Sequence, residues 1–312
     1  MDTLSESAAS DGRLLDPMTS MGAVSLRVAD LEGMSDYYTR AFGFEPIEEH
    51  RGAASVRRVL GRQGVPLVRM VHTPDLPVAH STEAGLYHTA FLFGSQSDLA
   101  SAVYRAARTP NTRFTGSADH LVSEAFYFVD PEGNGIELYR DRPRSQWQYD
   151  HGEVVMATDY LDVNHYVMTH LDQQDPERGL LGAAAVGHVH LQVGDIAQSS
   201  DFYIDVLGFE VTRSRRPGAL FASAGGYHHH VAFNVWHSRG AGPRAATLGL
   251  GELAVAVPSR IELDQLMDRL RIAGVPYRDR GASVEFADPW GIDISVSCGE
   301  GVEELLGRGL PI

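Results

Sequence analysis

The segment AVSLRVADLEGMSDYYTRAFGFEPI (residues 23–47) recurs later in the chain as HVHLQVGDIAQSSDFYIDVLGFEVT (residues 188–212). The two segments align without a gap at an offset of 165 residues, from position 23 to position 188. Each begins with alternating apolar residues, as a half-buried strand does, and continues as an amphipathic stretch that ends at Gly43 or Gly208, as a helix does. The repeat predicts a fold that is built from copies of one unit.

A second pair of segments extends this repeat. GLYHTAFLFGSQSDLASAVYRAA (residues 85–107) resembles GLGELAVAVPSRIELDQLMDRLR (residues 249–271), and each runs on to an Asp-Pro turn, at Asp130 or Asp288. Three short strands separated by turn residues complete each unit. The sequence therefore predicts an α+β fold of four βαβββ modules. The predicted divisions are a flexible arm (1–20), an N-terminal domain of two modules (21–144), a linker (145–182), a C-terminal domain of two modules (183–300) and a tail (301–312).

Composition excludes several classes of protein. The chain has 312 residues and a formal net charge of −15, which disfavours binding to nucleic acid or to an anionic membrane. Cys298 is the only cysteine, so an intramolecular disulfide is impossible and a reducing, cytoplasmic location is expected. No apolar run approaches the roughly 18 residues of a membrane span, and the polar start has no signal-peptide core.

Several motifs resemble those of the vicinal oxygen chelate superfamily, which includes glyoxalases and extradiol dioxygenases. The more specific ones are VGHVHL (186–191), SAGGYHHH (223–230) and DHLVSEAFYFVDPEGNGIELYRDRPR (119–144). They resemble the catechol 2,3-dioxygenase-like type I extradiol ring-cleaving dioxygenases, and the resemblance covers nearly all of residues 21–298. It implies that modules pair into two incomplete barrels, each around a cavity of the kind that usually holds a divalent metal.

The resemblance also implies a metal site of two histidines and one glutamate, a set that suits non-haem Fe(II) because it leaves coordination positions open. The matching positions are His188 on the first strand of module 3, His88 on the first strand of module 2 and Glu137 on the last strand of module 2. Strand alternation places each of them on the polar face of its strand. These residues form a complete set only if module 2 pairs with module 3.

The other two modules lack this set. Their counterparts are Ala23 for His188, Glu252 for His88 and Ser295 for Glu137. Pairing of modules 3 and 4 is the alternative, and it would supply His188, Glu252 and Ser295, of which serine is a poor ligand. We therefore expect modules 2 and 3 to form the active barrel and modules 1 and 4 to pair with each other.

The catalytic residues that the resemblance implies lie in two segments. A histidine beside the metal would exchange a proton with the substrate, and HHHVAF (228–233) places it at His229, with His230 as the second choice. A regular strand would instead turn His230 toward the cavity, unless the strand begins late or carries a bulge. In DHLVSEAFY, the resemblance assigns His120 and Tyr127 to contacts with the substrate or with oxygen. His190 and Asn234 join His230 as residues that bind substrate or support the ligands.

These inferences predict a metal-dependent extradiol dioxygenase of the catechol 2,3 type (EC 1.13.11.-), active in aromatic catabolism. Its cofactor would be Fe(II), with Mn(II) as the alternative, its co-substrate O2 and its partner a small catechol-like or hydroquinone-like diol. Two other classes stay open: a glyoxalase-like isomerase or thiol transferase, in which Asn234 would be a fourth ligand, and a non-catalytic protein that binds an aromatic or a drug. The particular diol and the oligomeric state are open as well.

Overall fold

The computed structural model describes residues 12–52, 55–176 and 182–299. The predicted tail and the first 11 residues of the predicted arm lie outside the described residues. The remainder of that segment packs on the protein, where Leu15 is buried and its backbone amide donates to the carbonyl of Gly208 over 2.9 Å. The predicted domain boundaries stay a prediction. No helix in the described part of the chain is long and apolar enough to cross a membrane.

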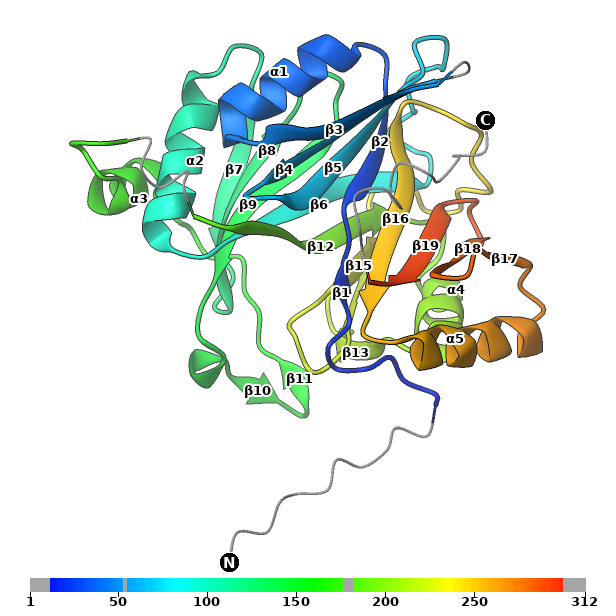
Figure 1. Ribbon diagram of the computed structural model, residues 1–312. Helices are drawn as coiled ribbons and strands as arrows, with labels where there is room; N and C mark the ends of the chain where they lie inside the picture. The colour runs from blue at the N-terminus through cyan, green and yellow to red at the C-terminus, as the bar shows by residue number, and fades with distance from the viewer. Residues whose placement is uncertain (1–11, 53–54, 177–181, 300–312) are drawn as a thin grey trace, which may run out of the picture.

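One large sheet, which we call the first–fourth sheet, contains the strands of modules 1 and 4 (Figure 1). Its strand order is β17-β18-β19-β16-β2-β5-β4-β3, with β1 beside β16. The strands are β1 (Ser20–Met21), β2 (Val24–Val28), β3 (Glu45–Arg51), β4 (Val56–Arg62), β5 (Val65–His72), β16 (Gly249–Val257), β17 (Tyr277–Asp279), β18 (Ser283–Ala287) and β19 (Asp293–Cys298).

The second–third sheet contains the strands of modules 2 and 3 in the order β13-β14-β15-β12-β6-β9-β8-β7. Its strands are β6 (Gly85–Phe93), β7 (Arg113–Asp119), β8 (Ser123–Val129), β9 (Gly135–Asp141), β12 (Ala184–Gln192), β13 (Glu210–Arg213), β14 (Ala219–Ser223) and β15 (Val231–Asn234). Between the modules, β10 (Tyr149–Asp150) and β11 (Glu153–Val154) form a small hairpin.

The two sheets confirm the predicted pairing of modules. At the centre of one sheet β2 pairs antiparallel with β16, and at the centre of the other β6 pairs antiparallel with β12. Modules 3 and 4 therefore contribute their first strands, β12 and β16, to different sheets. The alternative, in which modules 3 and 4 pair with each other, is wrong. The edge strands of each sheet do not pair with each other, so each sheet is an open, incomplete barrel.

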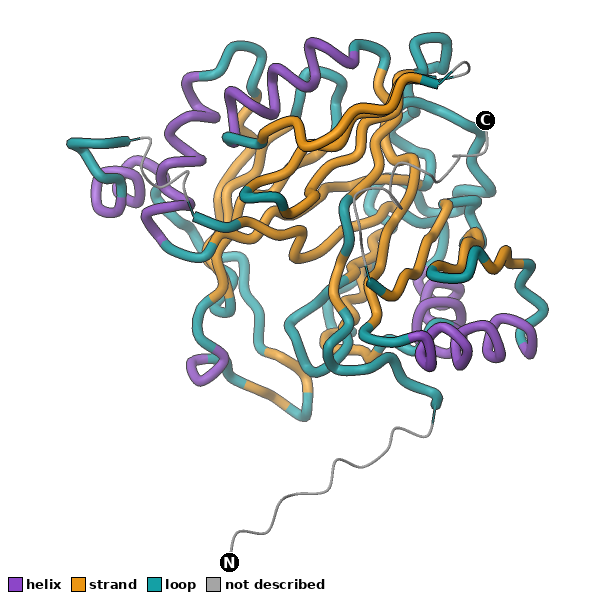
Figure 2. Tube along the Cα trace, in the orientation of Figure 1, coloured by secondary structure: helices purple, strands orange, loops and turns teal. Residues whose placement is uncertain are grey.

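The helices form two groups on opposite sides of the strands (Figure 2). They are α1 (Leu31–Phe42), α2 (Gln96–Arg108), α3 (Val163–His170), α4 (Ile196–Ser200), which continues as a π-helical segment (Asp201–Val206), and α5 (Arg260–Ile272). The predicted helix end at Gly43 is confirmed, because Gly43 adopts φ = 70° and its amide caps the carbonyl of Thr39. The helices and both sheets share one hydrophobic core.

The burial of each central strand follows its residue alternation. On β12, Val189 and Leu191 belong to the core shared with the helices, whereas His188 and His190 point from the opposite face. Both faces of β12 are covered, so all four side chains are buried. The apolar positions thus fix the strand in the core and leave the histidines on the concave side of the sheet.

Candidate metal centre and substrate pocket

Three buried side chains meet at the centre of the second–third sheet. His188 on β12, Ala90 on β6 and Glu137 on β9 are register partners in one row across neighbouring strands. Register partners face the same side of a sheet, and the small side chain of Ala90 leaves space between its neighbours. His88 enters this space from the adjacent row of β6. Nε2 of His88 lies 3.0 Å from Oε2 of Glu137, and Nε2 of His188 lies 3.2 Å from the same oxygen.

Burial and charge set the protonation of this group. His88, Glu137 and His188 are 6%, 3% and 2% exposed. Burial alone would raise the pKa of Glu137, but the adjacent His188 and His88 hold that pKa well below its usual range. Burial lowers the pKa of His188 to about 4, although Glu137 opposes the shift. A carboxylate facing a neutral imidazole is the protonation state in which both side chains ligate a metal.

The three side chains fit a divalent cation. Their donor atoms all lie within 4.8 Å of one another. Nε2 of His88 is buried and makes no hydrogen bond with any described residue, although it faces the carboxylate. Buried polar atoms are rarely left without a partner, and a metal would provide one. Two imidazoles and one carboxylate match the set that holds non-haem Fe(II) with open positions.

A second cluster of histidines fits a metal less well. His188, His228 and His229 also bring ligand atoms within 4.8 Å. Both ring nitrogens of His228 are already used, however: Nε2 lies 2.8 Å from Oδ1 of Asp141, and Nδ1 lies 2.8 Å from Nδ1 of His229. We therefore take His88, Glu137 and His188 as the candidate metal centre.

The contacts of His228 set the tautomer of His229. A carboxylate accepts hydrogen bonds only, so Nε2–H of His228 donates to Asp141. With this one proton on its ring, His228 accepts at Nδ1, and Nδ1–H of His229 donates to it. This leaves Nε2 of His229 with a lone pair, and no described residue is its hydrogen-bond partner. The ring of His229 packs on His188 in a tilted arrangement, with 4.0 Å between ring centroids, and lines the cavity.

The segment before β15 explains why His229 faces the cavity. β15 begins at Val231, so the three histidines precede the strand and do not follow its alternation. This is the late strand start that would reconcile the predicted position of His229 with alternation. His230 points elsewhere: its Nδ1 accepts a hydrogen bond from the amide of Ala224, and it does not line the cavity. Its role as a residue that binds substrate or supports the ligands stays a prediction.

Two tyrosines, Tyr139 and Tyr227, pack against the histidines. The hydroxyl of Tyr227 donates to Oδ2 of Asp141 over 2.7 Å and lies 2.7 Å from the hydroxyl of Tyr139. Tyr139 packs on His188 with 4.9 Å between ring centroids. Its hydroxyl occupies the space beside Gly187, where a Cβ atom would lie 1.7 Å from that oxygen. Any side chain at position 187 would displace Tyr139, so this glycine keeps the support in place.

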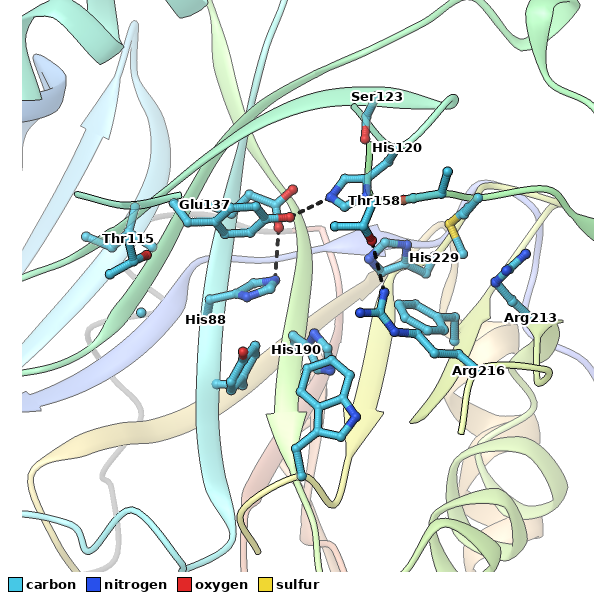
Figure 3. A pocket seen from close by; sticks show the side chains of 18 of the residues that line it. His88, Thr115, His120, Ser123, Glu137, Thr158, His190, Arg213, Arg216 and His229 are labelled. Carbon is cyan, nitrogen blue, oxygen red and sulfur yellow. Dashed lines mark hydrogen bonds and ion pairs between the residues drawn. The ribbon is translucent and has the colours of Figure 1, made fainter. Parts of the chain in front are cut away.

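His120 and Tyr127 form a second hydrogen-bonded pair on the cavity wall. Nδ1–H of His120 donates to the carbonyl of Ala157 over 2.6 Å, so its Nε2 accepts from the hydroxyl of Tyr127, also over 2.6 Å. Tyr127, on β8, is the register partner of Glu137, on β9, and this register places the pair beside the candidate metal centre. Figure 3 shows His120 on the same side of the pocket as Glu137. Arg142 holds the turn that carries His120 through paired hydrogen bonds to Asp119 of 2.8 and 2.7 Å.

His190 and Asn234 contact each other, and His190 also packs on His88 with 5.0 Å between ring centroids. The amide nitrogen of Asn234 donates to Nε2 of His190 over 3.0 Å, and its amide oxygen accepts from the backbone of Trp236 over 3.2 Å. Both polar atoms of Asn234 are therefore used. His190 lines the cavity and packs on Tyr87 and Trp236, with ring centroids 4.9 and 5.6 Å away.

The cavity has a volume of about 900 Å³ and opens beside these residues (Figure 3). Its size is that of a pocket for a small organic ligand. Apolar and aromatic side chains form part of the wall, among them Met156, Phe221 and Trp236. Sequence reasoning missed Tyr87, Trp236 and Arg216 in the lining, and also Asp141 behind His228. Of these, only Asp141 had a signal in the sequence, since it shares the alternating face of Glu137 and Tyr139 on β9.

The corresponding place in the first–fourth sheet holds an ion pair. There Arg69 on β5, Ser25 on β2 and Glu252 on β16 are register partners in one row. Nε of Arg69 donates to the hydroxyl of Ser25 over 2.6 Å, and a terminal nitrogen of the same guanidinium lies 3.3 Å from Glu252. Arg69 is fully buried. Its guanidinium thus supplies a positive charge beside Glu252, the counterpart of His88.

Comparisons with known proteins agree with this architecture. The family model described as the Glyoxalase/Bleomycin resistance protein/Dioxygenase superfamily matches residues 20–138 and 185–296. A catechol-2,3-dioxygenase of Bacillus subtilis (strain 168) is 35% identical over 280 residues, which cover 87% of this chain and 94% of that protein.

Two solved structures share the fold. A putative dioxygenase from Bacillus subtilis superposes with a TM-score of 0.60 at 11% identity, over 94% of this chain and 91% of that one. Glyoxalase I from Zea mays superposes with a TM-score of 0.55 at 16% identity, over 90% and 92% of the two chains. Proteins named for two different reactions thus have this fold, and the choice between those reactions depends on the site.

Proposed function

Because the chain belongs to the Glyoxalase/Bleomycin resistance protein/Dioxygenase superfamily, we propose that it is an extradiol dioxygenase that opens the ring of an aromatic diol with O2. His88, Glu137 and His188 hold the metal, which is Fe(II) or Mn(II). The diol is catechol-like or hydroquinone-like. The relative that is 35% identical and is named a catechol-2,3-dioxygenase supports this reaction class.

The observation that carries the proposal is the number of protein donors. Three donor atoms converge beside an open cavity, and Asn234, the residue that could have been a fourth ligand, lies opposite Gln192 on β12, four residues along the strand from His188. A metal with three protein ligands keeps positions for both oxygens of a diol and for O2. A glyoxalase-like reaction would be favoured by a fourth protein donor at this place.

Several residues around the cavity have a role in this reaction. The metal supplies a Lewis acid that lowers the pKa of a diol hydroxyl, and it supplies a redox centre for O2. Nε2 of His229 accepts the proton that the hydroxyl releases, since its Nδ1 already donates to His228. The hydroxyl oxygen of Tyr127 faces the substrate oxygens from the other side, and His120 orients it by accepting its proton in a hydrogen bond. The apolar wall around Phe221 and Met156 keeps water from the reacting atoms.

Oxygen consumption tests the proposal directly. The protein would be loaded with Fe(II), and separately with Mn(II), under nitrogen and then mixed in air with catechol, 3-methylcatechol or a hydroquinone. We expect oxygen uptake in step with loss of the diol, and a yellow product with visible absorbance. Metal binding without oxygen uptake from any diol would refute the dioxygenase and favour an isomerase or transferase. A protein that binds no metal would favour the non-catalytic binding protein.

The tautomer chain makes a separate prediction. Asp141→Asn can present its amide N–H to Nε2 of His228, which reverses the direction of both hydrogen bonds and places the proton of His229 on Nε2. The base is then lost, and we expect kcat to fall by about 10²-fold, within the usual range for a positioned acid–base group. The measurement is steady-state oxygen uptake together with metal content, which should stay at the wild-type value.

Asp268→Asn is the matched control for this variant. Asp268 is an exposed carboxylate on α5 that pairs with Arg271 and is not among the residues that line the cavity. It removes the same charge, and kcat should stay within about twofold of wild type, as for most exposed positions. If Asp141→Asn also leaves kcat within twofold, His229 does not depend on this chain for its tautomer.

A further inference from the structure

The charge of the cavity wall is opposite to the charge of the chain. The whole protein has 41 acidic and 26 basic residues. Four arginines line the cavity: Arg113, Arg213, Arg215 and Arg216. Glu137 is the single carboxylate among the described residues of the lining, and it belongs to the candidate metal centre. An acidic protein repels an anionic substrate at long range, so a local group of positive charges at the cavity is a feature that such a substrate requires.

The four guanidinium groups differ in how their charge is balanced. Arg215 forms ion pairs with Asp150 and Glu153, at 3.0 and 3.8 Å. Arg213 donates to a neutral group, the backbone carbonyl of Val154, over 3.2 Å. Within the described ranges, no carboxylate lies within ion-pair distance of Arg113, Arg213 or Arg216. The positive charge of these three side chains is therefore available to a ligand.

Arg216 lies against the aromatic part of the cavity wall. Its guanidinium lies 5.1 Å from the ring centre of Trp236 and donates to the hydroxyl of Thr158 over 3.3 Å. Figure 3 shows it on the side of the pocket where His190 and His229 lie. Burial raises the pKa of Tyr87 and of Tyr127, and the charge of Arg216 opposes both shifts. Its field thus reaches the residues around His88.

The contacts of Arg216 orient the guanidinium without neutralising it. The carbonyl of Arg216 accepts a hydrogen bond of 3.1 Å from the amide of Ala219, which closes the turn between β13 and β14. Trp236 supports one face of the guanidinium, and Thr158 binds one of its N–H groups. A planar fork held in this way can donate two parallel hydrogen bonds to a carboxylate.

We propose that Arg216 binds a carboxylate on the ring of the diol, so that the preferred substrates are anionic, carboxylated aromatic diols. The inference rests on the proposed function. A ring whose hydroxyls lie at the candidate metal centre leaves its substituent to the remaining cavity, where Arg216 provides the charge. Arg213 and Arg113 add to the positive field around that substituent.

The test compares each acid with its neutral methyl ester, which keeps the ring and the hydroxyls. The substrates are 2,3- and 3,4-dihydroxybenzoate and their methyl esters, and the quantity measured is the ratio of kcat/KM for acid over ester from oxygen uptake. We expect wild type to prefer the acid by at least about tenfold. Arg216→Gln should lower the ratio by about 10- to 100-fold, the size of one charge-assisted hydrogen bond. Arg216→Lys should retain part of the preference, because it keeps the charge and loses the fork.

Arg271→Gln is the matched control, because it removes one positive charge from an exposed site on α5 where Arg271 pairs with Asp268. Its ratio should equal that of wild type. A ratio in Arg216→Gln within twofold of wild type would overturn the inference and leave the proposed function intact. An equal loss of kcat/KM for acids and for esters would also overturn the inference, since Arg216 would then act on the hydroxyls or on the fold.

Binding without turnover separates the two proposals. Isothermal titration calorimetry under nitrogen measures the same acids and esters with wild type and with Arg216→Gln. If no diol supports oxygen uptake, the proposed function fails and calorimetry alone decides the inference. Tighter binding of acids than of esters, dependent on Arg216, would support an anion-binding pocket. Equal binding of acids and esters would refute it.

Discussion

Replacing His88 by alanine is expected to remove metal binding and to lower oxygen uptake by more than about 10²-fold. Even residues that only orient a metal ligand cost about 10- to 100-fold when they are lost, and His88 supplies one of three donor atoms. The two remaining donors, Glu137 and His188, cannot hold the metal at working concentrations. His188→Ala should behave in the same way. The measurements are metal content after loading and dialysis, and oxygen uptake with catechol.

A readout that does not depend on turnover accompanies this prediction. A ligand that binds only the folded protein raises its unfolding temperature, so Mn(II) should raise the melting temperature of wild type and leave that of His88→Ala unchanged. His72→Ala is the control, because it removes a partly buried histidine of β5, in the first–fourth sheet, that contacts the carbonyl of Ala29. Metal content and activity that persist in His88→Ala would refute the assignment of the ligands.

The sequence predicted the modules and their pairing because both depend on local and repeated signals. The 165-residue offset identifies equivalent positions, and the loss of ligand types at Ala23 and Ser295 indicates which modules lack a site. Strand alternation then predicts that His188 and Glu137 lie on the face of their strands opposite the helix-packed core. The structure brings these two residues and His88 together in adjacent rows of one sheet, and their role as ligands stays a prediction.

The parts that the sequence did not predict depend on contacts between distant segments. Asp141 reaches His228 across 87 positions of the chain, and no periodicity predicts which histidine of the run it contacts. The place of His229 depends on the start of β15 after His230, and the boundaries of elements are the least predictable feature of a sequence. Arg216 lies in a turn, where no alternation assigns a direction to the side chain.

Arg69 gives the largest expected effect on stability. In the first–fourth sheet its guanidinium is fully buried and lies against Glu252, which is 4% exposed. Arg69→Met removes a counter-charge from the buried carboxylate of Glu252. Breaking a buried ion pair by removing one partner costs about 3–5 kcal/mol of unfolding free energy. The measurement is the urea midpoint together with the m-value, which should not change.

The double variant Arg69→Met/Glu252→Met distinguishes charge from packing. Replacing both partners of a buried pair by apolar residues is often neutral or stabilising, so the double variant should recover most of the free energy that Arg69→Met loses. Arg40→Met, which removes an exposed pair with Asp36, should change stability by less than about 0.5 kcal/mol. A loss below about 1 kcal/mol in Arg69→Met would show that Arg69 is not the group that balances the charge of Glu252. Metal content should stay unchanged in all three variants, because the pair and the candidate metal centre lie in different sheets.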